Sequence, residues 1–174
     1  ERLQGTHPAG VITTGTLNDE PVHIVDAIYD LDFRKELITS MAYRKRIKPN
    51  GLKVRFHAEP EVSEWLDRER GEAYGELLST DQSNTSIVYS DRYILKIYRR
   101  LDRAVNPDLE LTKFFSDRTD FRNIPVLKGS IESDHADHPT MTLGMLQEWV
   151  KNPQDGWCWM KDNLNSFFER VQAL

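Results

Sequence analysis

Two short apolar runs, at residues 86–89 and 93–98, constrain the fold of this chain more than any other feature. Both runs are rich in β-branched and aromatic side chains, which favours strands. The polar tripeptide Ser90-Asp91-Arg92 lies between them and is typical of a tight turn. The two runs therefore predict an antiparallel hairpin in the middle of the chain.

Hydrophobic periodicity and turn residues predict an α+β protein around this hairpin. Before residue 72, we expect strands at 11–17, 21–27 and 52–57, the first two joined at Asn18-Asp19, and helices at about 32–46 and 60–70. After it, we expect strands at 74–79, 86–89, 93–98, 126–131 and 141–150, a helix that begins at Pro107 and a last helix at about 155–171.

The helix that begins at Pro107 has a clear start signal. Asn106 is a favourable N-cap residue, and proline is well tolerated at the first helical position. The apolar residues Leu111, Phe114 and Phe115 predict its buried face.

Local chemistry near Gly71–Gly75 predicts a boundary between two units. Residues 60–70 form a highly charged helical pattern with Pro60 in its first turn and Gly71 at its end. We therefore expect a small α+β unit at 1–72, a strand-rich antiparallel unit at 73–150 with one main helix, and a hinge and helix at 151–174.

Composition and charge exclude several classes of protein. The 174 residues include 23 Lys and Arg against 28 Asp and Glu, a net charge of -5, which argues against a general nucleic-acid binder because such proteins present a basic face. Cys158 is the only cysteine, which excludes a disulfide scaffold and a thiolate zinc site. The longest uncharged stretch, residues 3–18, is interrupted by Pro8 and Gly10, so we predict neither a membrane span nor a signal peptide. A soluble cytoplasmic protein is expected.

Lys96 is the most informative single residue. Strand alternation puts it on one face of the 93–98 strand together with Ile94 and Tyr98. A buried ammonium needs an anionic partner, and in a kinase it has two, the nucleotide phosphates and a helix carboxylate, for which Glu110 is the candidate. Alternatively, Lys96 reaches solvent from an edge strand and Glu110 only complements the helix N-terminus. The local sequence leaves both interpretations open.

Other segments with functional residue types give weaker signals. Residues 80–86 are rich in small hydrogen-bonding groups that could meet phosphate oxygens, but the absence of glycine excludes Walker-type and Gly-rich loops, and a polar hairpin is the simpler interpretation. Residues 134–138 contain a His-x-Asp, but Thr142 stands where a kinase catalytic loop needs asparagine. We interpret that segment as a surface turn and predict no metal site in this chain.

Several stretches together resemble the small lobe of maltokinases, bacterial enzymes that are fused to, or act with, trehalose synthase. The stretches are Gln82-Ser83-Asn84-Thr85-Ser86, Ile94-Leu95-Lys96, Arg99-Arg100-Leu101 and Asn106-Pro107-Asp108-Leu109-Glu110. Residues 25–30 with Phe33 resemble the amino-terminal cap subdomain of the fused versions, and Ile124-Pro125 and residues 146–150 fit the later strands and the hinge. The resemblance covers nearly the whole chain in consistent order.

This resemblance implies a protein-kinase-like bilobal fold. Residues 1–72 would be the cap subdomain, 73–150 the nucleotide-binding N-lobe, and 151–174 the connection to a second lobe. The family transfers the γ-phosphoryl group of ATP, with Mg²⁺, to the anomeric hydroxyl of maltose. By the same resemblance, Ser83, Asn84 and Thr85 lie over the phosphates, Lys96 clamps the phosphates and pairs with Glu110, Ile94 packs over adenine, and backbone groups around Gln147, Glu148 and Val150 meet the adenine edge.

The family's catalytic aspartate and metal ligands are expected beyond residue 174. The chain starts at Glu1 and ends inside an amphipathic pattern, so we expect an inactive piece of an active enzyme, without catalytic residues of its own. Its expected partners are ATP, maltose and a trehalose synthase module, and dimerisation through the last helix is a further alternative. Two other functions stay open: a kinase for another small molecule, such as an aminoglycoside or choline, and a non-catalytic assembly or regulatory module of a trehalose synthase fusion.

Overall fold

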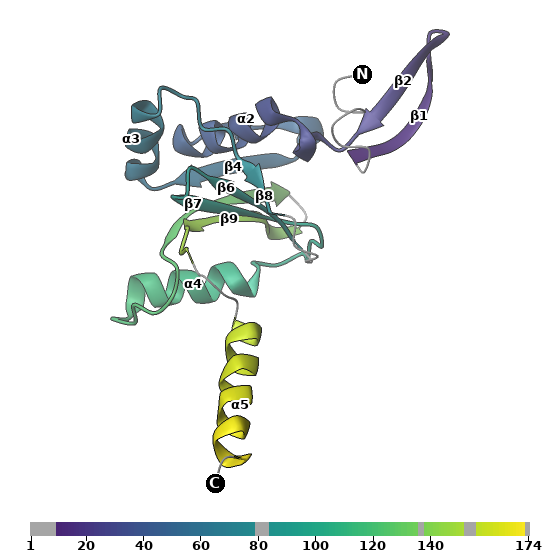
Figure 1. The fold of residues 1–174 in the computed structure, drawn as a ribbon. Helices are drawn as coiled ribbons and strands as arrows, with labels where there is room; N and C mark the ends of the chain where they lie inside the picture. Colours follow the sequence, from purple (N-terminus) through teal and green to yellow (C-terminus); the bar gives the residue numbers. More distant parts are fainter. Residues whose placement is uncertain (1–9, 79–83, 136–137, 152–155, 173–174) are drawn as a thin grey trace.

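The computed structural model describes residues 10–78, 84–135, 138–151 and 156–172. Within these ranges the chain forms a two-stranded hairpin, a seven-stranded antiparallel sheet and four α-helices (Figure 1). The α+β class predicted from the sequence is confirmed.

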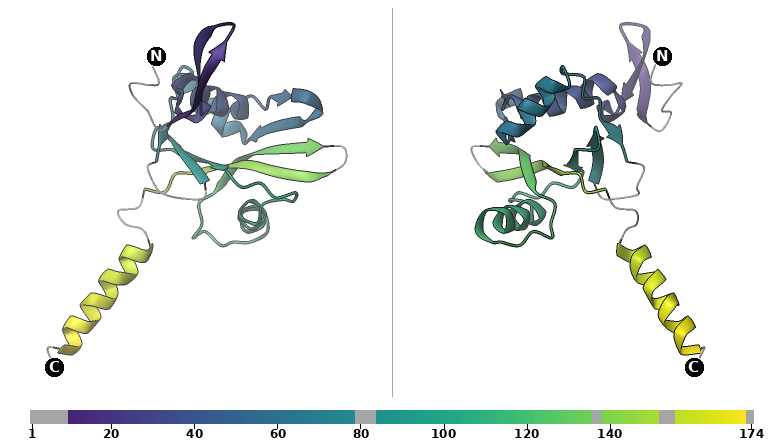
Figure 2. Two further views of the ribbon diagram at one scale, coloured as in Figure 1. Left: turned by 90° about the vertical axis from the view of Figure 1, so that its right-hand side faces the viewer. Right: turned by 60° about the vertical axis from the view of Figure 1, so that its left-hand side comes forward.

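The first element is a hairpin of β1 (Val11–Leu17) and β2 (Glu20–Val25). Its two turn residues, Asn18 and Asp19, have φ angles of 52° and 66°, a left-handed conformation that Asn and Asp tolerate and that two-residue hairpin loops require. The hairpin projects from the body of the molecule (Figures 1 and 2). The expected turn at Asn18-Asp19 is therefore confirmed.

The main sheet has the strand order β3-β4-β8-β9-β7-β6-β5. Its strands are β3 (Arg46–Ile47), β4 (Lys53–Ala58), β5 (Glu76–Leu77), β6 (Asn84–Tyr89), β7 (Tyr93–Tyr98), β8 (Leu127–His135) and β9 (His138–Glu148). The β6–β7 hairpin turns at Ser90 and Asp91, both with positive φ, as the tripeptide in the sequence predicted. This places β7 between β6 and β9, away from both edges of the sheet.

Helices cover both faces of the sheet. Figure 1 shows α2 (Leu31–Ala42) and α3 (Pro60–Arg68) on one face, α4 (Pro107–Arg118) on the other, and α5 (Gly156–Gln172) extending away from the body. The described residues also include the short 3₁₀ turns η2 (Ala27–Tyr29) and η3 (Pro49–Gly51). In the described part of the chain, none of the helices has the length and apolarity needed to cross a membrane.

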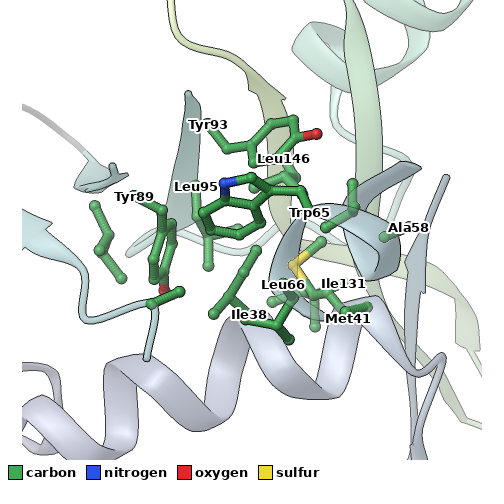
Figure 3. Packing of buried hydrophobic residues seen from close by; sticks show 14 of the residues in the cluster. Ile38, Met41, Ala58, Trp65, Leu66, Tyr89, Tyr93, Leu95, Ile131 and Leu146 are labelled. Atoms are coloured by element: carbon green, nitrogen blue, oxygen red, sulfur yellow. The ribbon is translucent and has the colours of Figure 1, made fainter. Parts of the chain in front are cut away.

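The main hydrophobic core lies between the sheet and the α2–α3 layer (Figure 3). Its fully buried side chains include Ile38 and Met41 from α2, Leu66 from α3, Leu95 from β7 and Leu146 from β9. The Trp65 ring meets the Tyr93 ring edge-on, with centroids 5.0 Å apart. A smaller cluster on the opposite face consists of Tyr98, Leu109, Met145 and Leu127.

The division expected near residue 72 does not separate two cores. Strand β4 pairs with β8 from Lys53↔Asp134 to Ala58↔Gly129, so strands from both sides of the expected boundary share one sheet. A two-stranded unit alone offers too little area to bury two helices. Helices α2 and α3 therefore use the larger sheet as their packing surface.

Two helices differ from the sequence prediction in detail. Helix α2 ends at Ala42 rather than near residue 46, because Arg44 adopts a positive φ of 51° and the chain turns into β3. In α4, Leu109 and Thr112 are buried, whereas the exposed fractions of Leu111 and Phe114 are 56% and 53%. The predicted buried face of α4 is thus wrong.

We predict that Gly129→Ala destabilises the fold by about 1–3 kcal/mol, the usual range for overpacking a tight site. A Cβ atom on Gly129 would lie 2.2 Å from the backbone oxygen of His57, so β4 and β8 would be pushed apart. Urea unfolding followed by circular dichroism measures the effect. Gly15→Ala is the matched control, because no heavy atom lies within 4 Å of its added Cβ; an equal loss in both variants would contradict the prediction.

Candidate functional site

Lys96 lies on the α4 face of the sheet, near the centre of strand β7. Its neighbours in register are Ser86 on β6 and Met145 on β9. Ser86 and Met145 are buried, while the Lys96 side chain is 29% exposed. The edge-strand interpretation of Lys96 is therefore wrong, because strands flank β7 on both sides.

Asp108, in the first turn of α4, is the acidic partner of Lys96. Its carboxylate oxygen Oδ2 lies 3.5 Å from the Lys96 ammonium and 3.3 Å from the Tyr98 hydroxyl. A tight charge-assisted hydrogen bond would be about 2.7–2.9 Å long. Since the ammonium has three N–H donors, this long contact leaves Lys96 able to bind a further anion.

The start of α4 is held by specific hydrogen bonds. The Asn106 side chain caps the helix by accepting from the Asp108 backbone N–H at 2.9 Å, and the Asn106 N–H donates to the Thr142 hydroxyl on β9 at 3.0 Å. The predicted N-cap role of Asn106 is confirmed. These bonds set the rotation of α4, so that Leu109 packs on the sheet and Asp108 faces Lys96.

The expected Lys96–Glu110 pair is not the one formed in this structure. Asp108 and Glu110 are two positions apart and so point about 200° away from each other around the helix. The Asp108 side chain contacts Lys96 and is still 45% exposed, and Glu110 is exposed as well. The acidic partner of Lys96 is therefore two residues earlier than the resemblance implied.

Burial and the neighbouring carboxylate both act on Tyr98. Burial raises the pKa of its hydroxyl, and the charge of Asp108 and their hydrogen bond raise it further. Tyr98 therefore stays protonated at neutral pH and donates its proton to Asp108. The hydroxyl competes with Lys96 for the same carboxylate oxygen.

Asn84 and Thr85, two of the residues predicted to lie over the phosphates, are on opposite faces of the sheet. Ser83 lies outside the described residues. Asn84 is in register with Tyr98 and, by alternation, on the Lys96 face. Thr85 is on the opposite face, where its hydroxyl accepts a hydrogen bond from Arg99 Nε at 2.8 Å.

Ile94 and Gln147 lie opposite each other on the Lys96 face, in register across β7 and β9. Ile94 is 9% exposed and Gln147 is 3% exposed. Both side chains are therefore covered in this structure, on the same face as the ammonium of Lys96.

At the end of β9, the backbone N–H groups of Glu148 and Trp149 already have acceptors. The Glu148 N–H donates to the Val126 carbonyl at 3.0 Å, and the Trp149 N–H donates to the Arg92 carbonyl at 2.8 Å. Within the described residues, the Val150 N–H makes no backbone hydrogen bond of this kind. Of the predicted hinge donors, Val150 is thus the one that could still bind a ligand.

Sequence reasoning put Tyr98 on the Lys96 face and Ser86 in the candidate phosphate segment, but it missed Asp108 as the partner of Lys96. The alternation of β7 already placed Tyr98 beside Lys96 on one face, so that pairing could have been inferred. Asp108 follows Pro107 directly and sits in a helix first turn, but choosing it over Glu110 requires the rotation of α4, which depends on Thr142. The register that pairs Ser86 with Lys96 follows from the three residues between the two predicted strands.

The described residues contain no group of three or more His, Cys, Asp and Glu side chains arranged to hold a metal ion. His135 and His138 are backbone partners in the pairing of β8 with β9, and the structure does not describe their side chains. Comparison of the chain with protein-family models gave no match.

We predict that Asp108→Asn lowers the free energy of unfolding by about 1 kcal/mol more than Glu110→Gln, the scale of a partly exposed charged contact. Both carboxylates lie in the first turn of α4 and benefit alike from the helix dipole. The difference between the variants therefore reports the contacts of Asp108 with Lys96 and Tyr98. Denaturant unfolding measures it, and equal effects of the two substitutions would contradict this arrangement.

Proposed function

We propose that this chain is the cap and nucleotide-binding small lobe of an ATP-dependent sugar kinase of the maltokinase class. The observation that carries the proposal is the half-buried Lys96 on β7 and its long contact with the Asp108 carboxylate. Asp108 belongs to α4, the only long helix on this face of the sheet within the described residues. By comparison, the buried Lys128 ammonium lies 3.0 Å from the Glu148 carboxylate.

The order of elements supports the proposal. Strands β5, β6 and β7 are followed by α4, then β8 and β9, and then by the segment that leads to α5. This is the chain order of a protein-kinase small lobe, in which the lysine lies on the third strand and pairs with the following helix. Fold order alone does not define an activity, so Lys96 and its contact with Asp108 are the specific support for a kinase.

In this proposal, each group on the Lys96 face has a simple task. Lys96 binds the α- and β-phosphates of ATP and exchanges part of its contact with Asp108 for them. Asn84 contributes a polar group near the phosphates, Ile94 packs against adenine, and the backbone at 147–150 meets the edge of the base. Glu110 stays a candidate second carboxylate only if α4 rotates when nucleotide binds.

The remaining chemistry belongs to a second lobe. Phosphoryl transfer needs an oriented acceptor hydroxyl and charge neutralisation by metal. We propose that the groups that hold Mg²⁺, activate the anomeric hydroxyl of maltose and bind the sugar lie outside this chain. A trehalose synthase module, in the same polypeptide or as a separate protein, would supply the metabolic context.

We predict that the complete protein releases ADP in a maltose-dependent manner and that Lys96→Ala lowers kcat/KM by roughly 100-fold or more, the usual effect of removing one charged group from a transferring phosphoryl site. Lys113→Ala is the matched control, because Lys113 is an exposed lysine on α4 and should leave activity unchanged. A coupled assay of ADP release, with maltose and other small acceptors, measures both.

The other outcomes separate the alternatives. ADP release with an aminoglycoside or choline, but not with maltose, would move the proposal to another acceptor. Lack of ATP binding would favour a non-catalytic assembly module, in which Lys96 is dispensable. Full activity of the Lys96→Ala protein would contradict the proposal.

A further inference from the structure

Lys128 is a buried charged residue that the proposed nucleotide site does not use. It lies near the start of β8 and is only 8% exposed. Its ammonium contacts two carboxylates, those of Glu61 in the first turn of α3 and of Glu148, the last residue of β9, the latter at 3.0 Å. The three side chains connect the cap helix α3 to the segment in which the base is proposed to bind.

The charge of Lys128 is maintained by its two partners. Burial by itself would lower the pKa of the ammonium, but the hydrogen bonds and charges of Glu61 and Glu148 outweigh it and the pKa is raised. Lys128 therefore remains a cation at neutral pH. Removing the cation would leave two neighbouring carboxylates that repel each other.

The charges of Glu61 and Glu148 also act on Arg92. Arg92 donates a hydrogen bond from Nε to the Tyr93 hydroxyl at 3.2 Å, which raises the pKa of the guanidinium, and the charges of Glu61 and Glu148 act in the same direction. Direct contacts within the cluster join Lys128 to the two carboxylates. Its position next to the Trp65–Tyr93 contact puts it on the α3 side of the sheet.

Glu148 is consequently fixed in three ways. Its side chain binds Lys128, its N–H donates to Val126, and the following N–H, of Trp149, donates to Arg92. Alternation puts the Glu148 side chain on the face opposite Gln147 and Lys96. The cluster therefore holds this segment from the α3 side, opposite the face on which Lys96 and Gln147 lie.

We propose that Lys128 is a positioning residue that fixes residues 148–150 for recognition of the nucleotide base, and that α3 takes part through Glu61. This inference rests on the proposed function. It assigns to the cap helix a role in nucleotide selectivity. Loss of the Lys128 charge should weaken binding of the base and leave binding of the phosphates intact.

The test compares two ligands of the complete protein with Mg²⁺: ATP and inorganic tripolyphosphate, which has phosphates but no base. For Lys128→Met, we expect the Kd of ATP to rise about tenfold, as for loss of a coupled contact, and the Kd of tripolyphosphate to stay the same. Lys128→Arg should restore most of the ATP affinity. Lys53→Met, at an exposed lysine on β4, is the matched control and should change neither Kd.

Glu61→Gln provides a milder variant, because it weakens the cluster from α3 without touching residues 147–150. It should raise the Kd of ATP by about threefold, a smaller coupled loss, and it keeps the test valid if Lys128→Met does not fold. An equal loss of affinity for both ligands, or an unchanged Kd of ATP in folded variants, would overturn this inference and leave the proposed function standing. If the wild-type protein binds neither ligand, the proposed function fails, and this inference with it.

Discussion

The pairing of β4 with β8 is the contact on which the rest of the structure depends. It joins the amino-terminal strands to the hairpin sheet over the register from Lys53↔Asp134 to Ala58↔Gly129, where the backbones approach so closely that only glycine fits. Because the sheet becomes seven strands wide, α2 and α3 can bury their apolar sides against it. The opposite face then remains for α4, Lys96 and Ile94. One face thus stabilises the molecule, and the other carries its candidate chemistry.

Each face of the sheet carries a lysine that contacts carboxylates, but the two sets of contacts differ. On the α4 face, Lys96 and Tyr98 share the Asp108 carboxylate at long distances. On the α3 face, Lys128 is buried between two carboxylates, and its contacts are supported by backbone hydrogen bonds. The difference fits two kinds of role, since a group that must bind a ligand needs free donors whereas a group that fixes a segment does not.

Much of this fold could be predicted from the sequence. The strand 93–98 is β7 in full, and the turns at Asn18-Asp19 and Ser90-Asp91 and the cap at Asn106 followed from local propensities. What failed depended on tertiary contacts: the joining of β4 to β8, the buried side of α4 and the choice of Asp108 over Glu110. Each of these is fixed by residues distant in sequence, such as Thr142 for the rotation of α4, and local periodicity carries no information about them.

Methyl NMR of two isoleucines tests the central claim most directly, because they lie on opposite faces of one sheet. Ile94 lies on the Lys96 face, whereas Ile87 is fully buried in the core beneath α2 and α3. On addition of ATP and Mg²⁺ to the complete protein, the ring current of adenine should shift the Ile94 methyl signals and leave those of Ile87 nearly unchanged. Saturable nucleotide binding with no shift at Ile94 would contradict the account.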